Sequence, residues 1–256
     1  MALVLISWQD LKRSLRDPVG LLMTLGVPLA LIVAIGLVAG HTPFQAAPAS
    51  GFDALSYIAP GMTLFFMMLS VRQAARTIAE DADRGVRDRL RSAPVADISI
   101  TAGNTVSHVV LLFFQLLVLI GISSLLYGLS WGPAGTVVLV CFALAVCASG
   151  WIALLLSLGR TPSRINALGM ALTLTFGILS RSFAAVIPST PAMDALARIS
   201  PNYWGQHAFL ALALGSGPSG ILRDIAALGI MCVVLWCASA LAAARPGGRP
   251  RSSKGR

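Results

Sequence analysis

The stretch RQAARTIAEDADRGVRDRLRSAPV, residues 72–95, interrupts an otherwise apolar chain and decides how that chain is arranged. It carries six arginines and four acids, and strongly hydrophobic segments lie on both sides of it. Positive charge this dense, placed next to membrane spans, is typically retained on the cytoplasmic side. We therefore predict that the stretch is a cytoplasmic loop that orients an integral membrane protein.

The overall composition supports a membrane protein. Of the 256 residues, 56% are hydrophobic and only 11% are charged, whereas a soluble domain carries about 25% charged residues. A net charge of +9 would suggest nucleic acid as a partner of a soluble protein. Here the arginines flank apolar segments, which indicates contact with anionic lipid headgroups and no nucleic-acid partner.

Six apolar segments reach or approach the roughly 20 residues that cross the hydrocarbon core of a bilayer. They are Val19–Gly40, Leu55–Val71, Ile100–Leu126, Ala134–Leu158, Ile165–Ala185 and Ile221–Ala244. The second segment is short, and we expect its helix to continue into the charged stretch. Tyr203–Leu214 is also apolar, but at about 1.5 Å per residue it reaches only about 18 Å. We expect it to be re-entrant, within an external segment of residues 186–218.

The distribution of basic residues supports this count. With the amino terminus inside, only Arg181, Arg198 and Arg223 lie in external segments, and all other basic residues lie in cytoplasmic segments. A seventh span at Tyr203–Leu214 would move the basic carboxyl-terminal tail outside. The predicted fold class is all-α, a polytopic protein with six transmembrane helices in residues 19–244. Both termini would lie in the cytoplasm, at the inner membrane.

The two ends of the chain have their own patterns. In residues 1–18 apolar side chains recur at helical spacing, which predicts an amphipathic interfacial helix that ends at Pro18. A cleaved signal peptide is the rival interpretation, but the apolar segment Val19–Gly40 has full spanning length. Residues 245–256 are rich in glycine, proline and arginine, so we expect a disordered tail near anionic headgroups.

Several kinds of chemistry are missing from the sequence. Neither lysine, Lys12 or Lys254, follows a glycine-rich phosphate loop. All ten acids fall in loops or at span ends, so the usual coupling group of an ion-driven carrier is absent. The acids and the four cysteines show no metal-ligand spacing either. We therefore predict a chain that is not an enzyme, binds no cofactor itself and receives energy from a partner.

An intramembrane enzyme is the rival class. Ser149 on the fourth span and His207 further along could form a protease dyad on separate helices. The run Ala148–Gly150 is also explained by close helix packing through small residues, without catalysis.

Polar residues mark one face of the third span. Asn104, His108 and Gln115 are spaced i, i+4 and i+11, and polar groups in hydrocarbon turn inward to find partners. They either form interhelical hydrogen bonds or line a translocation path.

The charged stretch itself predicts two helices. Two pairs at i, i+4 support helix on both sides of Gly85: Glu80–Arg84 and Asp83–Arg87. Gly85 weakens the helix by roughly 1 kcal/mol relative to alanine, so we expect a bend there. Val86 and Leu90 then share a face of a short second helix that ends at Pro94. The alternative is a loop that only sets topology.

This run, EDADRGVRDRLRSAP from Glu80 to Pro94, resembles the cytoplasmic loop of ABC-2 type transporter permeases. Its second half is similar to the form in daunorubicin-resistance-type drug exporters. Further similarities follow in the family's order: Tyr57–Gly61, Gly103, Ile187–Pro191 and Ile199–Pro201. One departure is LSR at Leu179–Arg181, where many members have LSG.

The resemblance implies the membrane half of an exporter, in which two permease chains, identical or sister, pair with two ATPase subunits that bind ATP and magnesium. It implies a coupling helix that docks on the ATPase: Glu80, Asp81, Gly85, Val86, Arg87, Leu90 and Pro94. It also implies an external segment, in which Arg181, Pro188 and Pro201 are candidate gate residues. The expected cargo is an amphipathic drug-like or lipid-like compound. A polysaccharide or lipid-linked glycan is the alternative.

Overall fold

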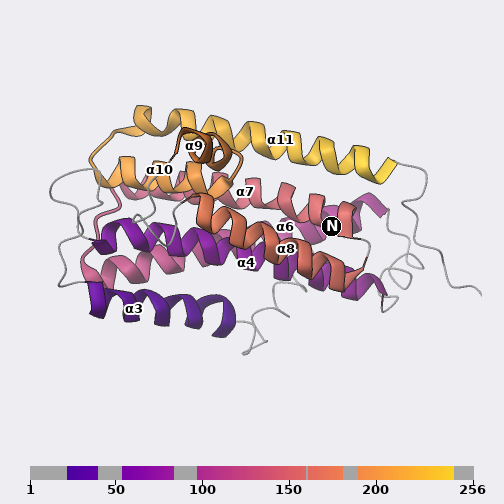
Figure 1. The fold of residues 1–256 in the computed structure, drawn as a ribbon, viewed down its shortest axis with the longest axis horizontal. Helices are drawn as coiled ribbons and strands as arrows, with labels where there is room; N and C mark the ends of the chain where they lie inside the picture. The colour runs from indigo at the N-terminus through magenta and orange to yellow at the C-terminus, as the bar shows by residue number, and fades with distance from the viewer. Residues whose placement is uncertain (1–21, 40–53, 84–96, 160, 181–189, 245–256) are drawn as a thin grey trace, which may run out of the picture.

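The computed structural model describes residues 22–39, 54–83, 97–159, 161–180 and 190–244, and all regular structure in these ranges is helical. The elements are η1 (Leu22–Gly26), α3 (Val27–Ala39), α4 (Ala54–Asp83), α6 (Asp97–Tyr127), α7 (Ala134–Gly159), α8 (Pro162–Leu179), α9 (Pro191–Ala197), α10 (Pro201–Ala213), η2 (Pro218–Ile221) and α11 (Leu222–Ala244). Figure 1 shows the long helices side by side, with α3 at one edge and α11 at the other. The predicted all-α class is confirmed for these residues.

Within the described ranges, three helices are long and apolar enough to cross a membrane: Thr105–Tyr127, Ala134–Gly159 and Pro218–Ala242. They coincide with the third, fourth and sixth predicted spans. A shorter apolar helix at Thr24–Ala34 lies within the first predicted span. The count of six spans stays a prediction, as do the interfacial helix of residues 1–18 and the tail of residues 245–256, which lie outside the described ranges.

Helix α4 continues beyond its apolar span into the charged stretch. It has 30 residues, which at about 1.5 Å per residue gives a length of about 45 Å, half as long again as the hydrocarbon core. The helix runs past Val71, the end of its predicted apolar span, through Arg72 and on to Asp83. The expected continuation of the second span into the charged stretch is therefore confirmed.

Helix α7 lies at the centre and packs against α4, α6, α8, α10 and α11. Three side chains of α11 reach successive turns of α7. They are Cys232 Sγ to the Val146 carbonyl (3.4 Å), Trp236 Nε1 to Ser149 Oγ (3.2 Å) and Ser239 Oγ to the Ala153 carbonyl (3.0 Å). Residue numbers rise together along this ladder, so α7 and α11 run in the same direction.

A glycine brings these two helices close together. A Cβ on Gly150 would lie 2.9 Å from the Cβ of Leu235 and 3.3 Å from the Cys232 carbonyl oxygen, closer than side chains normally approach. The small residues around Ser149 thus serve helix packing, as one of the two interpretations of this run predicted.

Helices α3 and α6 also run in the same direction. Gln115 of α6 donates to the Thr24 carbonyl in η1 (3.2 Å), and Tyr127, three turns further on, donates to the Val33 carbonyl in α3 (3.1 Å). These bonds tie the first predicted span to the third one at two levels of the bundle.

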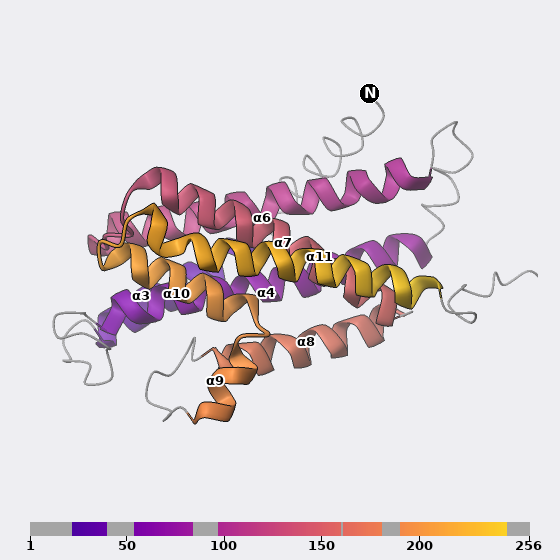
Figure 2. The ribbon, with the colours of Figure 1, turned by 90° about the horizontal axis from the view of Figure 1, so that it is seen from above.

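The segment Tyr203–Leu214 falls in α10, a helix of 13 residues that is too short to span the hydrocarbon core. Its start is fixed by Ser200, whose hydroxyl accepts the Asn202 N–H (3.1 Å), and by Pro201 at the first helical position. Figure 2 shows α10 alongside the end of the bundle where α11 begins, with the short α9 below α8.

Candidate site at the charged end of helix α4

The charged end of α4 keeps one apolar face. Val71, Ala75 and Ile78 are buried at helical spacing, and they continue the buried side of the apolar half of the helix. Helix α8 packs along α4. The polar extension therefore remains attached to the bundle and is not a free arm.

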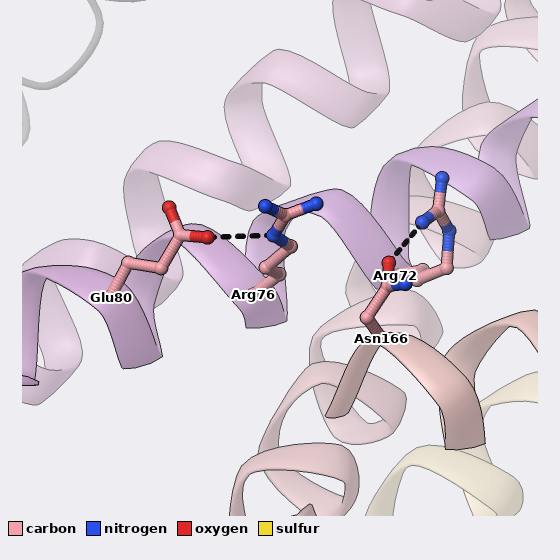
Figure 3. Close-up of polar contacts among 4 residues, drawn as sticks. All are labelled: Arg72, Arg76, Glu80 and Asn166. Carbon is pink, nitrogen blue, oxygen red and sulfur yellow. Dashed lines mark hydrogen bonds and ion pairs between the residues drawn. The ribbon is translucent and has the colours of Figure 1, made fainter. Parts of the chain in front are cut away.

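Arg76 and Glu80 form an ion pair one turn apart on this extension, with Arg76 Nε 2.6 Å from Glu80 Oε1 (Figure 3). Both side chains are partly exposed, so the pair stabilises the helix by only a few tenths of a kcal/mol. The expected Glu80–Arg84 and Asp83–Arg87 pairs involve residues outside the described ranges. The sequence pattern did not single out Arg76 as the partner of Glu80.

A cross-helix contact lies one turn before this pair. The Arg72 Nη1 donates to the Asn166 Oδ1 on α8, as Figure 3 shows. The Arg72 Nε is buried and has no hydrogen-bond partner in the described part of the chain. The amide oxygen of Asn166 thus compensates part of the cost of burying a guanidinium group between two helices.

The sequence of α8 explains why Asn166 reaches this position. Thr161 caps the helix by accepting the Arg164 N–H (3.3 Å), and Pro162 occupies its first turn. Asn166 and Gly169 then follow three residues apart on one face. A Cβ on Gly169 would lie 2.6 Å from the Arg72 Cγ and 2.9 Å from its Cβ, so only glycine allows α4 and α8 to meet at Arg72.

The structure describes only some of the residues that were predicted to dock on the ATPase. Glu80 and Asp81 lie in the last turns of α4. Gly85, Val86, Arg87, Leu90 and Pro94 lie outside the described residues, and so does the proposed short second helix. Their roles stay predictions.

The three polar residues of the third span all lie in α6. Gln115 is buried and bonds to the backbone of η1, which is an interhelical contact. His108 is half-buried, and the side chain of Asn104 lies outside what the structure describes. A role of this face in lining a path stays a prediction.

Among the candidate gate residues, Pro201 is buried at the start of α10. Arg181 and Pro188 lie outside the described residues.

The rival pair Ser149 and His207 has other partners. Ser149 Oγ donates to the Val146 carbonyl (2.6 Å) and accepts from Trp236. His207 Nδ1 lies 3.0 and 2.9 Å from the two carboxylate oxygens of Asp224, a fully buried residue in the first turn of α11. The structure gives Ser149 and His207 no contact with each other in the ranges it describes. The His207–Asp224 pair was not expected from the sequence.

Aromatic rings surround this histidine. Tyr203 stacks on His207 with 6.4 Å between ring centroids, and Arg223 lies over the Trp204 ring at 5.7 Å. Together with the His207–Asp224 bond, these contacts fasten α10 to the start of α11. Within the described ranges, no group of three or more histidine, cysteine, aspartate or glutamate side chains could hold a metal ion.

Comparison with known proteins identifies the class of the chain. A family model described as "ABC-2 family transporter protein" matches residues 42–241. The linearmycin resistance permease protein LnrN of Bacillus subtilis (strain 168) is 31% identical over 148 residues. That match covers 57% of this chain and 38% of the relative, so the chain aligns with less than half of the relative's length.

Proposed function

The chain belongs to the ABC-2 family of transporter proteins, and from this membership we propose that it is the membrane-spanning permease subunit of an ATP-driven exporter. The family match over residues 42–241 carries the proposal, because it covers the helices from α4 to most of α11. ATP and magnesium would bind to a separate ATPase subunit, and a second permease chain would complete the pathway.

The proposed topology has six spans with both termini in the cytoplasm. In such a chain the first and third spans run outward, and the fourth and sixth run inward. The shared direction of α3 with α6, and of α7 with α11, supports this order. In the proposed topology, the charged end of α4 would lie at the cytoplasmic face and α10 near the external face.

The proposed coupling follows from the continuity of α4. An ATPase that presses on residues 84–95 would transmit the movement along one unbroken helix. The contact of Arg72 with Asn166 and Gly169 joins that helix to α8 where it leaves the apolar bundle. A displacement of the charged end would therefore move α8 with it. Movement of the two helices would then open the pathway first to one side of the membrane and then to the other.

The proposed cargo is an amphipathic drug-like or lipid-like compound. The similarity to a permease named for linearmycin resistance favours a compound of this kind over a polysaccharide. A membrane protease is not favoured, because the hydroxyl of Ser149 is engaged by Trp236 and His207 is engaged by Asp224.

The test is co-expression of the chain with a candidate partner ABC ATPase in a linearmycin-sensitive bacterium. We expect a several-fold rise in the inhibitory concentration of linearmycin or of another membrane-active compound in a parallel panel. An ATPase variant without its P-loop lysine is the matched control and should abolish the effect. Vigorous ATP hydrolysis by the purified permease alone would contradict the proposal.

A further inference from the structure

Two amide side chains on α10 lack partners in the interior of the bundle. Asn202 is 0% exposed and Gln206 is 4% exposed. Neither the oxygen nor the nitrogen of either amide has a hydrogen-bond partner in the part of the chain that the structure describes. The two residues are four positions apart, so their side chains lie on one face of α10, about one turn apart.

The residues next to these amides on α10 have apolar neighbours. Between them in the sequence, Gly205 faces α4 and α7, and a Cβ there would lie 2.8 Å from Leu64 and 2.9 Å from Leu144. One turn beyond Gln206, the ring of Phe209 meets the ring of Trp131 edge to face at 5.7 Å between centroids. The unpaired groups are therefore shielded from both lipid and bulk water.

Several other buried polar side chains of the bundle are paired, although Arg72 Nε and the indole N–H groups of Trp131 and Trp151 lack a partner among the described residues. The Thr63 hydroxyl donates to the Ala59 carbonyl at 2.9 Å, and the Gln115 amide donates to the Thr24 carbonyl at 3.2 Å. A buried amide without a partner is costly, and native proteins normally satisfy such groups with protein or ordered water. Four unpaired polar atoms on one helical turn thus indicate a missing hydrogen-bonding molecule.

We infer that Asn202 and Gln206 form a binding site for ordered water within the bundle. The amides are uncharged and offer both donors and acceptors, which suits a neutral molecule and not an ion. Side chains at i and i+4 are about 5–6 Å apart at their Cβ atoms, a separation that one water can bridge. Two amides also supply the two to four partners that a buried water requires.

Bound water would allow α10 to separate from α4 and α7 without leaving the two amides unpaired. If α10 separates from the bundle, the amides pass from one water to others and none of their polar atoms is left unpaired. An apolar face of the same shape would have no polar contact to exchange. The inference does not depend on the identity of the cargo or of the ATPase.

The first test replaces the amides with apolar side chains of similar shape, Asn202→Leu and Gln206→Met, singly and together in the full-length chain in lipid nanodiscs. If water satisfies the amides, the double variant loses that hydrogen-bonded site, and its melting temperature falls by several degrees. If the amides are dry and unpaired, the same changes remove a desolvation penalty and the melting temperature rises, which overturns the inference. Thr63→Val, which removes a bond within one helix, is the control for polar-to-apolar exchange.

A second readout separates lost water from poor packing. Radiolytic hydroxyl-radical labelling with mass spectrometry modifies buried side chains where a water molecule lies next to them. Phe209 is 0% exposed, so bulk water does not reach it and any label on it would report the bound water. We therefore expect Phe209 to be labelled in the wild type and unlabelled in the double variant. Absence of label on Phe209 in the wild type, or label that persists in the double variant, overturns the inference whatever the melting temperature does.

Discussion

The Arg72 guanidinium of α4 donates a hydrogen bond to the Asn166 amide oxygen of α8, 94 positions further along the chain. The contact lies where α4 changes from an apolar span to a charged extension. It is thus placed to hold two helices together at the boundary between the bundle and the segment proposed to meet the ATPase.

Replacement of Asn166 by alanine should weaken this junction. The change leaves the partly buried guanidinium without its acceptor, and hydrogen bonds to charged groups contribute about 1.5–3 kcal/mol. We expect a lower free energy of unfolding in mixed micelles and less transport per ATP hydrolysed. Asn166→Asp keeps an acceptor at the same place and is the matched control. Equal losses in both variants would argue against the hydrogen bond as the cause.

Gly169→Ala should separate α4 from α8. The new methyl group would overlap the Arg72 side chain close to its backbone, where it cannot swing away. Overpacking of this kind costs about 1–3 kcal/mol. Gly121→Ala is the control, because a Cβ at Gly121 meets nothing within 4 Å in the same bundle. If both variants unfold alike, the close approach at Arg72 is unimportant.

An acidic residue at Leu90 or Val86 should abolish export without preventing insertion. Each substitution places a charge on the apolar pair that we propose to dock on the ATPase. The measurements are drug resistance and the amount of chain in the membrane. Ser92→Asp adds the same charge close by and should be tolerated. Continued export by Leu90→Asp would show that the stretch sets topology only.

Ser149→Ala should leave export close to that of the wild type. It removes the acceptor of the Trp236 indole and one rung between α7 and α11, a loss of about 1 kcal/mol. The measurement is export together with thermal unfolding, with Trp236→Phe as the complementary variant. A proteolytic activity that disappears in Ser149→Ala would instead support the enzyme interpretation.

His207→Leu should destabilise the end of the bundle where α10 meets the start of α11. Asp224 is fully buried, and both of its carboxylate oxygens lie within hydrogen-bond distance of His207 Nδ1. Unfolding of this variant should be easier, and a second change, Asp224→Asn, should recover part of the loss by removing the unpaired charge. No recovery in the double variant would show that the two side chains act independently.

The sequence predicted the helical class and the extension of the second span because both depend on local composition. The charged residues after Val71 keep helical propensity and an apolar face, so the continuation of α4 could be expected. Helix α10 has thirteen residues, too few to cross a bilayer, and its re-entrant placement stays a prediction.

The pairings between helices could not be predicted in the same way. In a membrane bundle the lipid-facing and core-facing sides are both apolar, so hydrophobic periodicity does not reveal which face meets which neighbour. Arg72 therefore seemed a topology signal, and its partner Asn166 was not singled out. The spacing of Asn166 and Gly169 on one face was the available hint. His207 was associated with Ser149 by residue type, whereas the fold gives it Asp224.

The ladder between α7 and α11 sets limits on how the molecule can change shape. A slip of one helix past the other by a single turn would break all three rungs together, and the close contact at Gly150 opposes a partial slip. The contacts thus hold α7 and α11 in a fixed position relative to each other. In the proposed exporter, movement would then fall to α4 and α8, which the Arg72–Asn166 hydrogen bond joins at their charged boundary.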